Sequence, residues 1–590
     1  MKRILCLILA CLTIGFLCIG CVHEKSGGNV SEELSDTETG TNTKTDIQPE
    51  TPNGVLSLIA NGASDYKIIV SSGASNTIQA LALKVWEGIR EKTGVRLERG
   101  DDMIIESLGM TERETEILIG ESNRADSQAV FNGLRYHDYC VAIRGKKLII
   151  AGGSESALAD AVDSFLEKID AQTWLDSDNV RYTSDMCVSY NGTYRYTAMT
   201  LNGKDIAEYN IVYPKSDAYL KASASRLVQT IGDLYGYVPK LVADNKTNGS
   251  DANIYIGNIG TDAGFSQTVT DREILAVQIL GNSMRLVGKE RQDTLEGIRK
   301  VEEYLLKEST SPTMQLTASQ NIPLTVKTYT AMSFNVLATG FNDRKELVRD
   351  AILSAMPDTV GVQEENSQWR TYLEDVLGQN GYARVGEIFT PSQTDGDWTN
   401  FTNSIYYRMD KFKLIETGTR MYSETPDIMG SASEYVRNRA YTYAVLEDKE
   451  TGRRFLRTNT HFSFDDEKGY LYQIEKLNGL FEEMKEKYDI PYVASGDYNI
   501  WKSWDWYKTM TATYGWVDSN VASSKLEAIP DNVDYIFISP NTVLPLKYDI
   551  LNCDYGYPYV IKEQWDNGKT NGQSYYVSDH SPVILTYYLP

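Results

Sequence analysis

Histidine is scarce in this sequence, with only four among 590 residues. Two of them, His461 and His580, stand in short polar motifs near the C-terminus, close to residues typical of strands. Histidine is the side chain whose ordinary pKa lies nearest to neutral pH, so its use beside Asp and Asn indicates acid–base chemistry. The sequence therefore predicts a functional site around these two residues.

Cysteine is also scarce, and four of the seven cysteines lie within the first 21 residues. The other three, Cys140, Cys187 and Cys553, are too few for a disulfide framework. Cys140 and Cys187 could pair in an oxidising compartment or could both stay as buried thiols, and the sequence leaves both open. Beyond residue 21 no Cys-x-x-Cys pair or Cys/His cluster occurs, so we expect no structural zinc site.

Positive charge is in deficit, since 58 Lys and Arg face 81 Asp and Glu, for a formal net charge of −23. A passive nucleic-acid binder needs a basic surface, which this balance argues against. A bound metal ion could still bring a phosphate into an acidic site. The charge thus makes a nuclease less favoured without excluding one.

Long apolar runs are absent after residue 20. Lys2 and Arg3 precede an apolar stretch that ends in Leu-Cys-Ile-Gly-Cys at Cys21, which resembles the lipobox of bacterial lipoproteins. The resemblance implies a signal peptide over 1–21, lipid on Cys21 and an extracytoplasmic location at the bacterial cell membrane. A plain secretory signal or an uncleaved anchor is the alternative. Residues 22–54 are polar and predict a flexible linker.

Two segments of the front half share one order of elements. Each begins with an apolar strand, continues through an amphipathic helix that stops at a glycine, and then has an Ile-x-Ile-Gly strand, a hairpin and a last helix. The first segment covers 55–190 and the second covers 196–320. The matching order at similar spacing predicts a duplicated small α/β domain.

Both segments resemble the non-catalytic α/β domains that precede the barrel in bacterial hexosaminidases and related glycosidases. The resemblance rests on the Ile-x-Ile-Gly strand after an amphipathic helix, and no pair of catalytic carboxylates accompanies it. It implies a stalk or a surface that contacts glycans, and the sequence leaves the two open.

From residue 328 the pattern changes to short strands with polar residues at their ends. The chain alternates as a strand before Asn335, forms a buried run before Glu364, and is strand-like again before His461 and Asp497. Further polar residues stand beside strand-like stretches in the same way: Asn403, Asn499, Asp534, Asp579 and His580. Each alone could close a turn or cap a strand, but together they predict one site.

This order of motifs resembles the endonuclease/exonuclease/phosphatase superfamily over 328–590. The resemblance implies two packed β-sheets with helices outside, and a site where the strands finish. We therefore expect an α/β and α+β multidomain chain, in which two small α/β domains precede a two-sheet β-sandwich flanked by helices.

The resemblance also implies a role for each polar residue. Glu364, Asn335 and Asp579 would hold a metal, and their hard oxygen atoms favour Mg²⁺ or Mn²⁺. Asp497 would activate the attacking water, and Asn499 would steady it or the phosphate.

The two histidines would act on the phosphate. His580 would contact it while Asp534 binds the other ring nitrogen, and His461 would donate to a non-bridging oxygen. Arg439 and Asn403 are weaker candidates for substrate binding. Near Arg439 this sequence lacks the carboxylate that supports a histidine in pancreatic-type deoxyribonuclease, which weakens that specific function.

These features together predict a surface-anchored, Mg²⁺- or Mn²⁺-dependent phosphoesterase. Its substrate would be a phosphomonoester or phosphodiester on a lipid headgroup, a nucleotide or nucleic acid, or a sugar. An extracellular nuclease is one alternative. A glycan-binding lipoprotein with an inactive phosphoesterase-like domain is the other. Oligomeric state and the number of metal ions are not determined by the sequence.

Overall fold

The computed structural model describes residues 54–105, 111–172, 174–176, 178–247, 252–259, 264–265, 268–464, 467–523, 533–551, 559–561 and 575–590. The predicted signal peptide, the lipid site at Cys21, the linker before Gly54 and Cys553 lie outside the described residues. Within them no helix is both long enough and apolar enough to cross a membrane.

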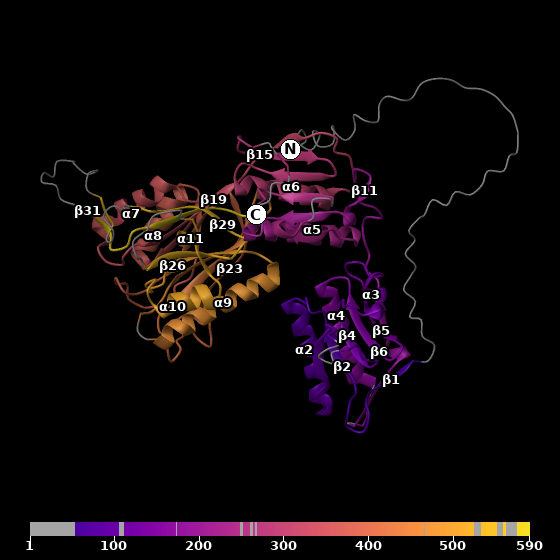
Figure 1. Ribbon diagram of the computed structural model, residues 1–590. Helices are drawn as coiled ribbons and strands as arrows, with labels where there is room; N and C mark the ends of the chain where they lie inside the picture. The colour runs from indigo at the N-terminus through magenta and orange to yellow at the C-terminus, as the bar shows by residue number, and fades with distance from the viewer. Residues whose placement is uncertain are drawn as a thin grey trace, which may run out of the picture.

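The first unit is a mixed six-stranded sheet with helices on both faces (Figure 1). Its strand order is β3 (Glu98–Asp101), β2 (Lys67–Val70), β4 (Glu116–Ile119), β6 (Lys147–Gly152), β5 (Tyr139–Arg144) and β9 (Val188–Tyr190). The helices are α2 (Asn76–Thr93), α3 (Ala125–Phe131) and α4 (Glu155–Gln172). Helix α2 starts where the Ser75 hydroxyl accepts the Ile78 N–H, and it ends at Gly94 in the left-handed conformation that glycine adopts readily.

The second unit repeats this plan. Its sheet runs β13 (Lys240–Ala243), β12 (Asn210–Tyr213), β14 (Asn253–Ile256), β16 (Ser283–Val287), β15 (Ile274–Leu280) and β18 (Gln320–Pro323), with helices α5 (Ala218–Tyr235) and α6 (Arg291–Lys307). Each unit also carries a small three-stranded sheet: β1 (Val55–Ile59), β8 (Asn179–Thr183) and β7 (Trp174–Asp176) in the first, and β11 (Lys204–Asp205), β10 (Thr200–Leu201) and β17 (Thr313–Met314) in the second.

In the first unit Cys140 and Cys187 are free thiols.

The third part is a sandwich of two six-stranded sheets. One sheet runs β21 (Tyr382–Val385), β22 (Ile405–Arg408), β20 (Thr359–Gln363), β19 (Thr328–Asn335), β32 (Val583–Tyr588) and β29 (Leu544–Ile550). The other runs β23 (Phe412–Met421), β24 (Ala440–Asp448), β25 (Arg454–His461), β26 (Tyr492–Asp497), β28 (Asp534–Ile538) and β27 (Val517–Asp518). The predicted fold class is confirmed.

Helices cover the outer faces of the sandwich. Helices α7 (Phe341–Ala355) and α8 (Ser367–Gln379) pack on the first sheet through a cluster that includes Trp369 and Leu373. Helix α9 (Glu467–Tyr488) packs on the second sheet through residues such as Leu477 and Phe481. Burial of these apolar faces holds the helices outside and leaves the strand ends uncovered for a site.

A buried arginine joins the two sheets. The Arg457 guanidinium on β25 donates to the Met332 carbonyl at 3.0 Å and to the Thr359 hydroxyl at 3.0 Å, both on the opposite sheet. Burial lowers the pKa of Arg457 to about 10. Because these bonds are directional, they fix how one sheet lies over the other and thus which strand ends meet.

The second unit is packed against the sandwich through α6. The Glu296 carboxylate, only 1% exposed, pairs with Arg453 and accepts the Tyr588 hydroxyl at 2.8 Å. Tyr219 donates to the Val543 carbonyl at 3.0 Å, and Tyr588 shares the apolar cluster of the second unit. Strand β32, which ends in Tyr588, pairs with β19, so this contact supports the strand that carries Asn335.

Candidate active site

The candidate site lies where strands of both sheets end. In the second sheet His461 is opposite Asp497, and Asp497 is in turn opposite Asp534. In the first sheet Asn335 is opposite Gln363, the residue before Glu364. Paired strands lie about 5 Å apart, so the register alone brings these side chains together.

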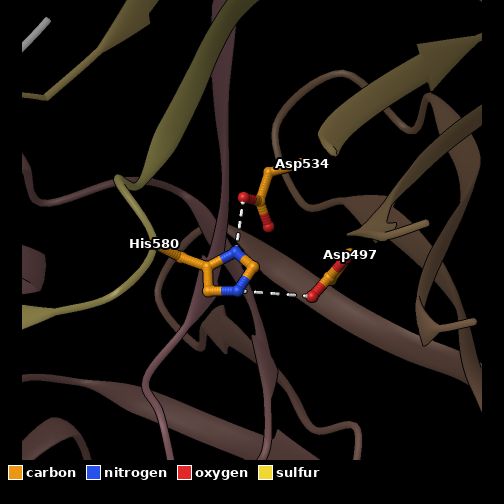
Figure 2. A group of neighbouring side chains, drawn as sticks. All are labelled: Asp497, Asp534 and His580. Carbon is orange, nitrogen blue, oxygen red and sulfur yellow. Dashed lines mark hydrogen bonds and ion pairs between the residues drawn. The ribbon is translucent and has the colours of Figure 1, made fainter. Parts of the chain in front are cut away.

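An imidazole lies between two carboxylates at the centre of the site (Figure 2). His580 Nδ1 is 2.7 Å from Asp534 Oδ2, and His580 Nε2 is 3.6 Å from Asp497 Oδ2. Burial would lower the pKa of His580, but the charges of Asp534, Asp497 and Asp579 raise it to about 10. At neutral pH this ring is therefore a cation that presents an N–H from Nε2.

Asp497 is a buried carboxylate held by neutral donors. Its Oδ1 accepts the Asn499 backbone N–H at 3.0 Å, and its Oδ2 accepts the Asn335 side-chain amide at 3.1 Å. Burial raises the pKa of Asp497 to about 6, although the nearby His580 charge opposes the rise. The group is thus ionised at neutral pH and more basic than an ordinary aspartate, which suits a proton acceptor.

Asn335 connects Asp497 to Glu364. The same side-chain amide donates to Glu364 Oε1 at 3.1 Å, and the Ala338 N–H donates to Glu364 Oε2 at 2.9 Å. Glu364 has a φ of +59°, uncommon for a residue with a side chain, and is half-buried at the site. The next residue, Glu365, is fully buried and accepts from the Tyr406 hydroxyl at 2.5 Å. The turn at Glu364 thus separates a carboxylate of the site from one of the core.

His461 is a neutral partner in the site. Its Nε2 lies 3.5 Å from Asp497 Oδ2, and only 8% of the residue is exposed. Burial, together with the charges of Arg439 and His580, lowers the pKa of His461 well below its ordinary value. Arg439 itself is half-buried and precedes β24. The structure thus places Arg439 within electrostatic range of the site, as a phosphate-binding role requires.

The remaining predicted residues take different places. Asp579 Oδ1 lies 4.0 Å from His580 Nε2, and its side chain is 39% exposed, so it lies at the rim of the site. Asn499 steadies Asp497 with its backbone, while its side chain donates to the Phe462 carbonyl at 2.9 Å. Asn403 is fully buried and donates to the Ala440 carbonyl at 2.7 Å. In this position Asn403 supports the strand that follows Arg439, and its burial does not fit the predicted contact with substrate.

Sequence reasoning missed two residues that shape the site from behind. Arg344 on α7 is buried and donates to the carbonyls of Val336 at 2.8 Å and Val577 at 2.5 Å. The Ser578 hydroxyl donates to the Asn335 carbonyl at 2.7 Å. These bonds hold the end of β19 beside the segment that carries His580. An arginine within an amphipathic helix is usually exposed to solvent, so no local sequence pattern identified Arg344 as a buried residue.

The acidic groups could hold a metal ion. Ligand atoms of Asp497, Asp534 and His580 lie within 4.8 Å of one another. His580, however, carries a proton and gives Nδ1 to Asp534, so it is a poor ligand. Glu364 is better suited, since among the described residues only neutral N–H groups approach its two oxygens. The Asn335 Oδ1 accepts the Leu337 N–H at 3.0 Å and keeps a second lone pair. This all-oxygen donor set fits a hard cation.

An aromatic rim lies beside the site. The Tyr470 hydroxyl donates to the Asn499 carbonyl at 2.9 Å, and its ring contacts Trp504 and Trp506. Trp504 and Trp501 are 40% and 39% exposed. Through Tyr470 this apolar surface is joined to the Asn499 segment, and it offers a contact for the part of a ligand that does not react.

No protein-family model and no curated protein sequence matches this chain. Several solved structures are similar to its C-terminal part, among them the following three. An endonuclease/exonuclease/phosphatase family protein of Bacteroides thetaiotaomicron is 20% identical and covers 45% of this chain and 99% of its own, with a TM-score of 0.38. A mannosyl-6-phosphatase of the same organism is 20% identical over 44% of this chain and 100% of its own, with a TM-score of 0.37. The human Nocturnin catalytic domain with bound sulfate is 19% identical and covers 45% of this chain and 95% of its own, with a TM-score of 0.36.

Proposed function

We propose that this protein is a metal-dependent phosphoesterase that hydrolyses a phosphate ester with an activated water. The observation that carries the proposal is the arrangement of Asp534, His580 and Asp497, in which a cationic imidazole faces a buried carboxylate of raised basicity. A protonated donor and a base side by side are what hydrolysis of an anionic ester requires.

In this mechanism Asp497 takes a proton from water as the water oxygen forms a bond to phosphorus. The bond from phosphorus to the ester oxygen breaks on the opposite side, and the leaving oxygen takes a proton from solvent. His580 donates from Nε2 to a phosphoryl oxygen, and His461 and Arg439 would add further donors. Asn335 and Asn499 hold the Asp497 carboxylate so that one lone pair faces the water.

A divalent cation would supply charge neutralisation at the phosphate. Glu364 and Asn335 would hold it, with Asp579 reaching it from the rim. Mg²⁺ or Mn²⁺ is the proposed ion because all three side chains offer oxygen. The protein's own contribution is to keep Glu364 and Asp497 at a fixed separation through one shared amide.

The substrate we propose is a phosphomonoester or phosphodiester on a lipid headgroup, a nucleotide or a sugar. The exposed tryptophans beside Asn499 favour a substrate with an apolar or ring-shaped part. An extracellular nuclease stays the alternative. We further propose that Cys21 carries lipid at the outer side of a bacterial cell membrane, and labelling with a fatty acid should then be lost in Cys21→Ala.

The test is hydrolysis of bis-4-nitrophenyl phosphate and 4-nitrophenyl phosphate by the chain from Gly54 onward, with Mg²⁺ present. Turnover of one of them that disappears in His580→Ala supports a phosphoesterase, and the preferred compound indicates diester or monoester chemistry. Equal turnover in His580→Ala would contradict the proposed site. Lys84→Ala, an exposed change in the first unit, serves as the control.

A further inference from the structure

A second cleft lies in the first unit, far along the chain from the residues described above. It has a volume of about 760 Å³ and is lined by the loops that follow β2, β4 and β6. A ligand pocket in a protein measures roughly 300–1,000 Å³, so the cleft is large enough for a small molecule.

The cleft lies at the point where the chain changes sides of the sheet. Strands β2 and β4 are parallel neighbours. After β2 the chain enters α2, which packs with α4 on one face, whereas after β4 it enters α3, whose Val130 packs on the other face. Because the two connections diverge, a crevice opens at the carboxyl ends of these strands, where open α/β sheets bind ligands.

The described residues that line the cleft are mostly polar, and none of them is a lysine or arginine. They include five serines (Ser71, Ser72, Ser75, Ser122 and Ser154) and the amides of Asn123 and Gln128. Ile78, Phe131 and Leu158 give it a small apolar side. Such a surface offers hydrogen-bond donors and acceptors side by side, together with an apolar patch that can contact the C–H groups of a ligand.

Charge decides which ligand fits. The two helices that start at the cleft, α2 and α4, contribute about half a positive charge each. Three carboxylates, those of Asp102, Glu121 and Glu155, line the same space. The balance is therefore negative, which disfavours phosphate and other anions. Both Asp102 oxygens accept backbone N–H groups, from Ser72 and Asn123 at 2.8 Å each, and thus serve the framework of the cleft.

The second unit has the same framework, but an ion pair replaces the hydrogen bond between the two helix starts. Asp244 accepts the Lys215 N–H at 3.1 Å, as Asp102 accepts the Ser72 N–H. In the first unit Ser75 donates to Glu155 at 2.5 Å across the two helix starts. At the matching positions of the second unit Asp217 and Arg291 form an ion pair at 2.7 Å.

The glycines that follow the central strands support the same comparison. A Cβ on Gly257 would lie 2.5 Å from the Leu220 side chain, whereas a Cβ on Gly120 would lie 3.4 Å from the nearest atom, in Leu158. The side chain at the third position of the first helix therefore lies closer to this glycine in the second unit than in the first, where Ile78 is 3.7 Å from the same point. Among the described residues, the second unit thus shows one way in which the space between the two helix starts is filled.

We propose that the first unit binds a neutral saccharide in this cleft. The sugar hydroxyls would exchange hydrogen bonds with the serines, Asn123 and the carboxylates Glu121 and Glu155, and one face of the ring would rest on Phe131. This site is separate from the phosphoesterase site and does not depend on it.

The test is calorimetric titration of the full chain, purified in a detergent without a sugar headgroup. The probes are maltotriose, cellotriose, mannotriose and chitotriose, with inorganic phosphate and spermidine as anionic and cationic probes. At least one neutral trisaccharide should bind. The double variant Ser75→Asp/Glu155→Arg, which installs the ion pair of the second unit, should weaken that binding by about ten-fold or more.

Phe131→Ala provides a second variant should the double change disturb folding, and it should weaken binding of the same trisaccharide. Lys84→Ala, on an exposed position of α2, should bind as the unchanged chain does. Absence of binding by every trisaccharide would overturn the proposal, as would binding of phosphate or spermidine alone. Equal affinity in both cleft variants would also overturn it. Phosphate-ester turnover should be unchanged in all of them, which separates this result from the outcome at His580.

Discussion

His580 Nδ1 lies 2.7 Å from Asp534 Oδ2, and this contact joins the two sheets of the sandwich at the site. His580 precedes β32 of the first sheet, whereas Asp534 begins β28 of the second. The protonation state of one ring therefore depends on how the sheets are held together, a task in which the buried Arg457 takes part.

The Asp534–His580 contact should be visible as a titration. In the metal-free chain from Gly54 onward three histidines remain, and the His580 ring should stay protonated to a pKa of about 10. Asp534→Asn removes the largest raising charge, so the pKa of His580 should fall. Histidine-selective NMR from pH 5 to 11 measures both. An unchanged His580 titration in Asp534→Asn would show that the contact does not set its charge.

His461 should behave in the opposite way. Since burial and the charges of Arg439 and His580 lower its pKa, the folded protein should keep this ring neutral at pH 6 while the unfolded chain protonates it. Stability should therefore decline as the pH falls below about 6.5, the ordinary value, and His461→Gln should lessen that decline. Urea unfolding at pH 7.5 and 5.5 tests this, and an equal pH dependence in both proteins would contradict it.

Loss of the proposed base should reduce turnover with little change in fold. Asp497→Ala should lower kcat by about 10²–10⁴-fold, the usual contribution of a positioned base. Steady-state kinetics on the ester cleaved by the unchanged chain, with circular dichroism as the folding control, would measure it. Asp549→Ala, a partly exposed aspartate on β29, is the matched control. Near-normal turnover in Asp497→Ala would remove this residue from the mechanism.

Activity should depend on a hard cation. Chelation should abolish turnover, and Mg²⁺ or Mn²⁺ should restore it because the proposed ligands are oxygen atoms. Glu364→Gln keeps the shape but removes the charge, so it should raise the Mg²⁺ concentration needed for half-maximal activity. Restoration by Zn²⁺ alone would show that the ligand set is wrong.

The buried Glu296 should be a large contributor to stability. Its removal leaves Arg453 buried without a partner, which costs about 3–5 kcal/mol. Asp160→Ala, at the matching but exposed position of α4, should cost less than about 0.5 kcal/mol. Urea unfolding of Glu296→Ala and Asp160→Ala gives the comparison, and similar effects of the two changes would contradict the prediction.

The stabilisation from Glu296 should also depend on pH. Burial would raise the pKa of Glu296, but Arg299 and Arg453 lower it below its ordinary value of 4.5. A carboxyl group with a lowered folded-state pKa stabilises the protein above its unfolded value and loses that contribution as the pH falls through the folded value. The penalty of Glu296→Ala should therefore shrink below about pH 4.5.

The sequence predicted the strand ends well because a strand is recognised by the local alternation of apolar and polar residues. Asn335, His461, Asp497 and Asp534 were found where apolar alternation meets a polar residue, and all four meet in the structure. The two-sheet fold was implied by the resemblance of this motif order to the endonuclease/exonuclease/phosphatase superfamily.

Cross-sheet contacts could not be predicted in this way. Several contacts depend on how the sheets and helices pack on one another. Asn335 links Glu364 to Asp497, Arg344 holds two loops from behind the site, and Asn403 faces inward. Such contacts join residues far apart in the sequence, 233 positions for Arg344 and Val577, and leave no local pattern. The interaction of Glu296 with Arg453 and Tyr588 belongs to the same class.

Helices α4 and α6 hold matching places in the two units, but their outer faces differ. In α6 the acidic residue Glu296 is committed to the neighbouring sandwich, whereas its counterpart in α4, Asp160, is left in solvent. In the second unit Asp217 and Arg291 form an ion pair at the two helix starts, whereas in the first unit the matching helix starts line the cleft. A change at Asp160 therefore leaves the contact with the sandwich untouched, whereas a change at Glu296 reaches Tyr588 and, through β32, the strand that carries Asn335.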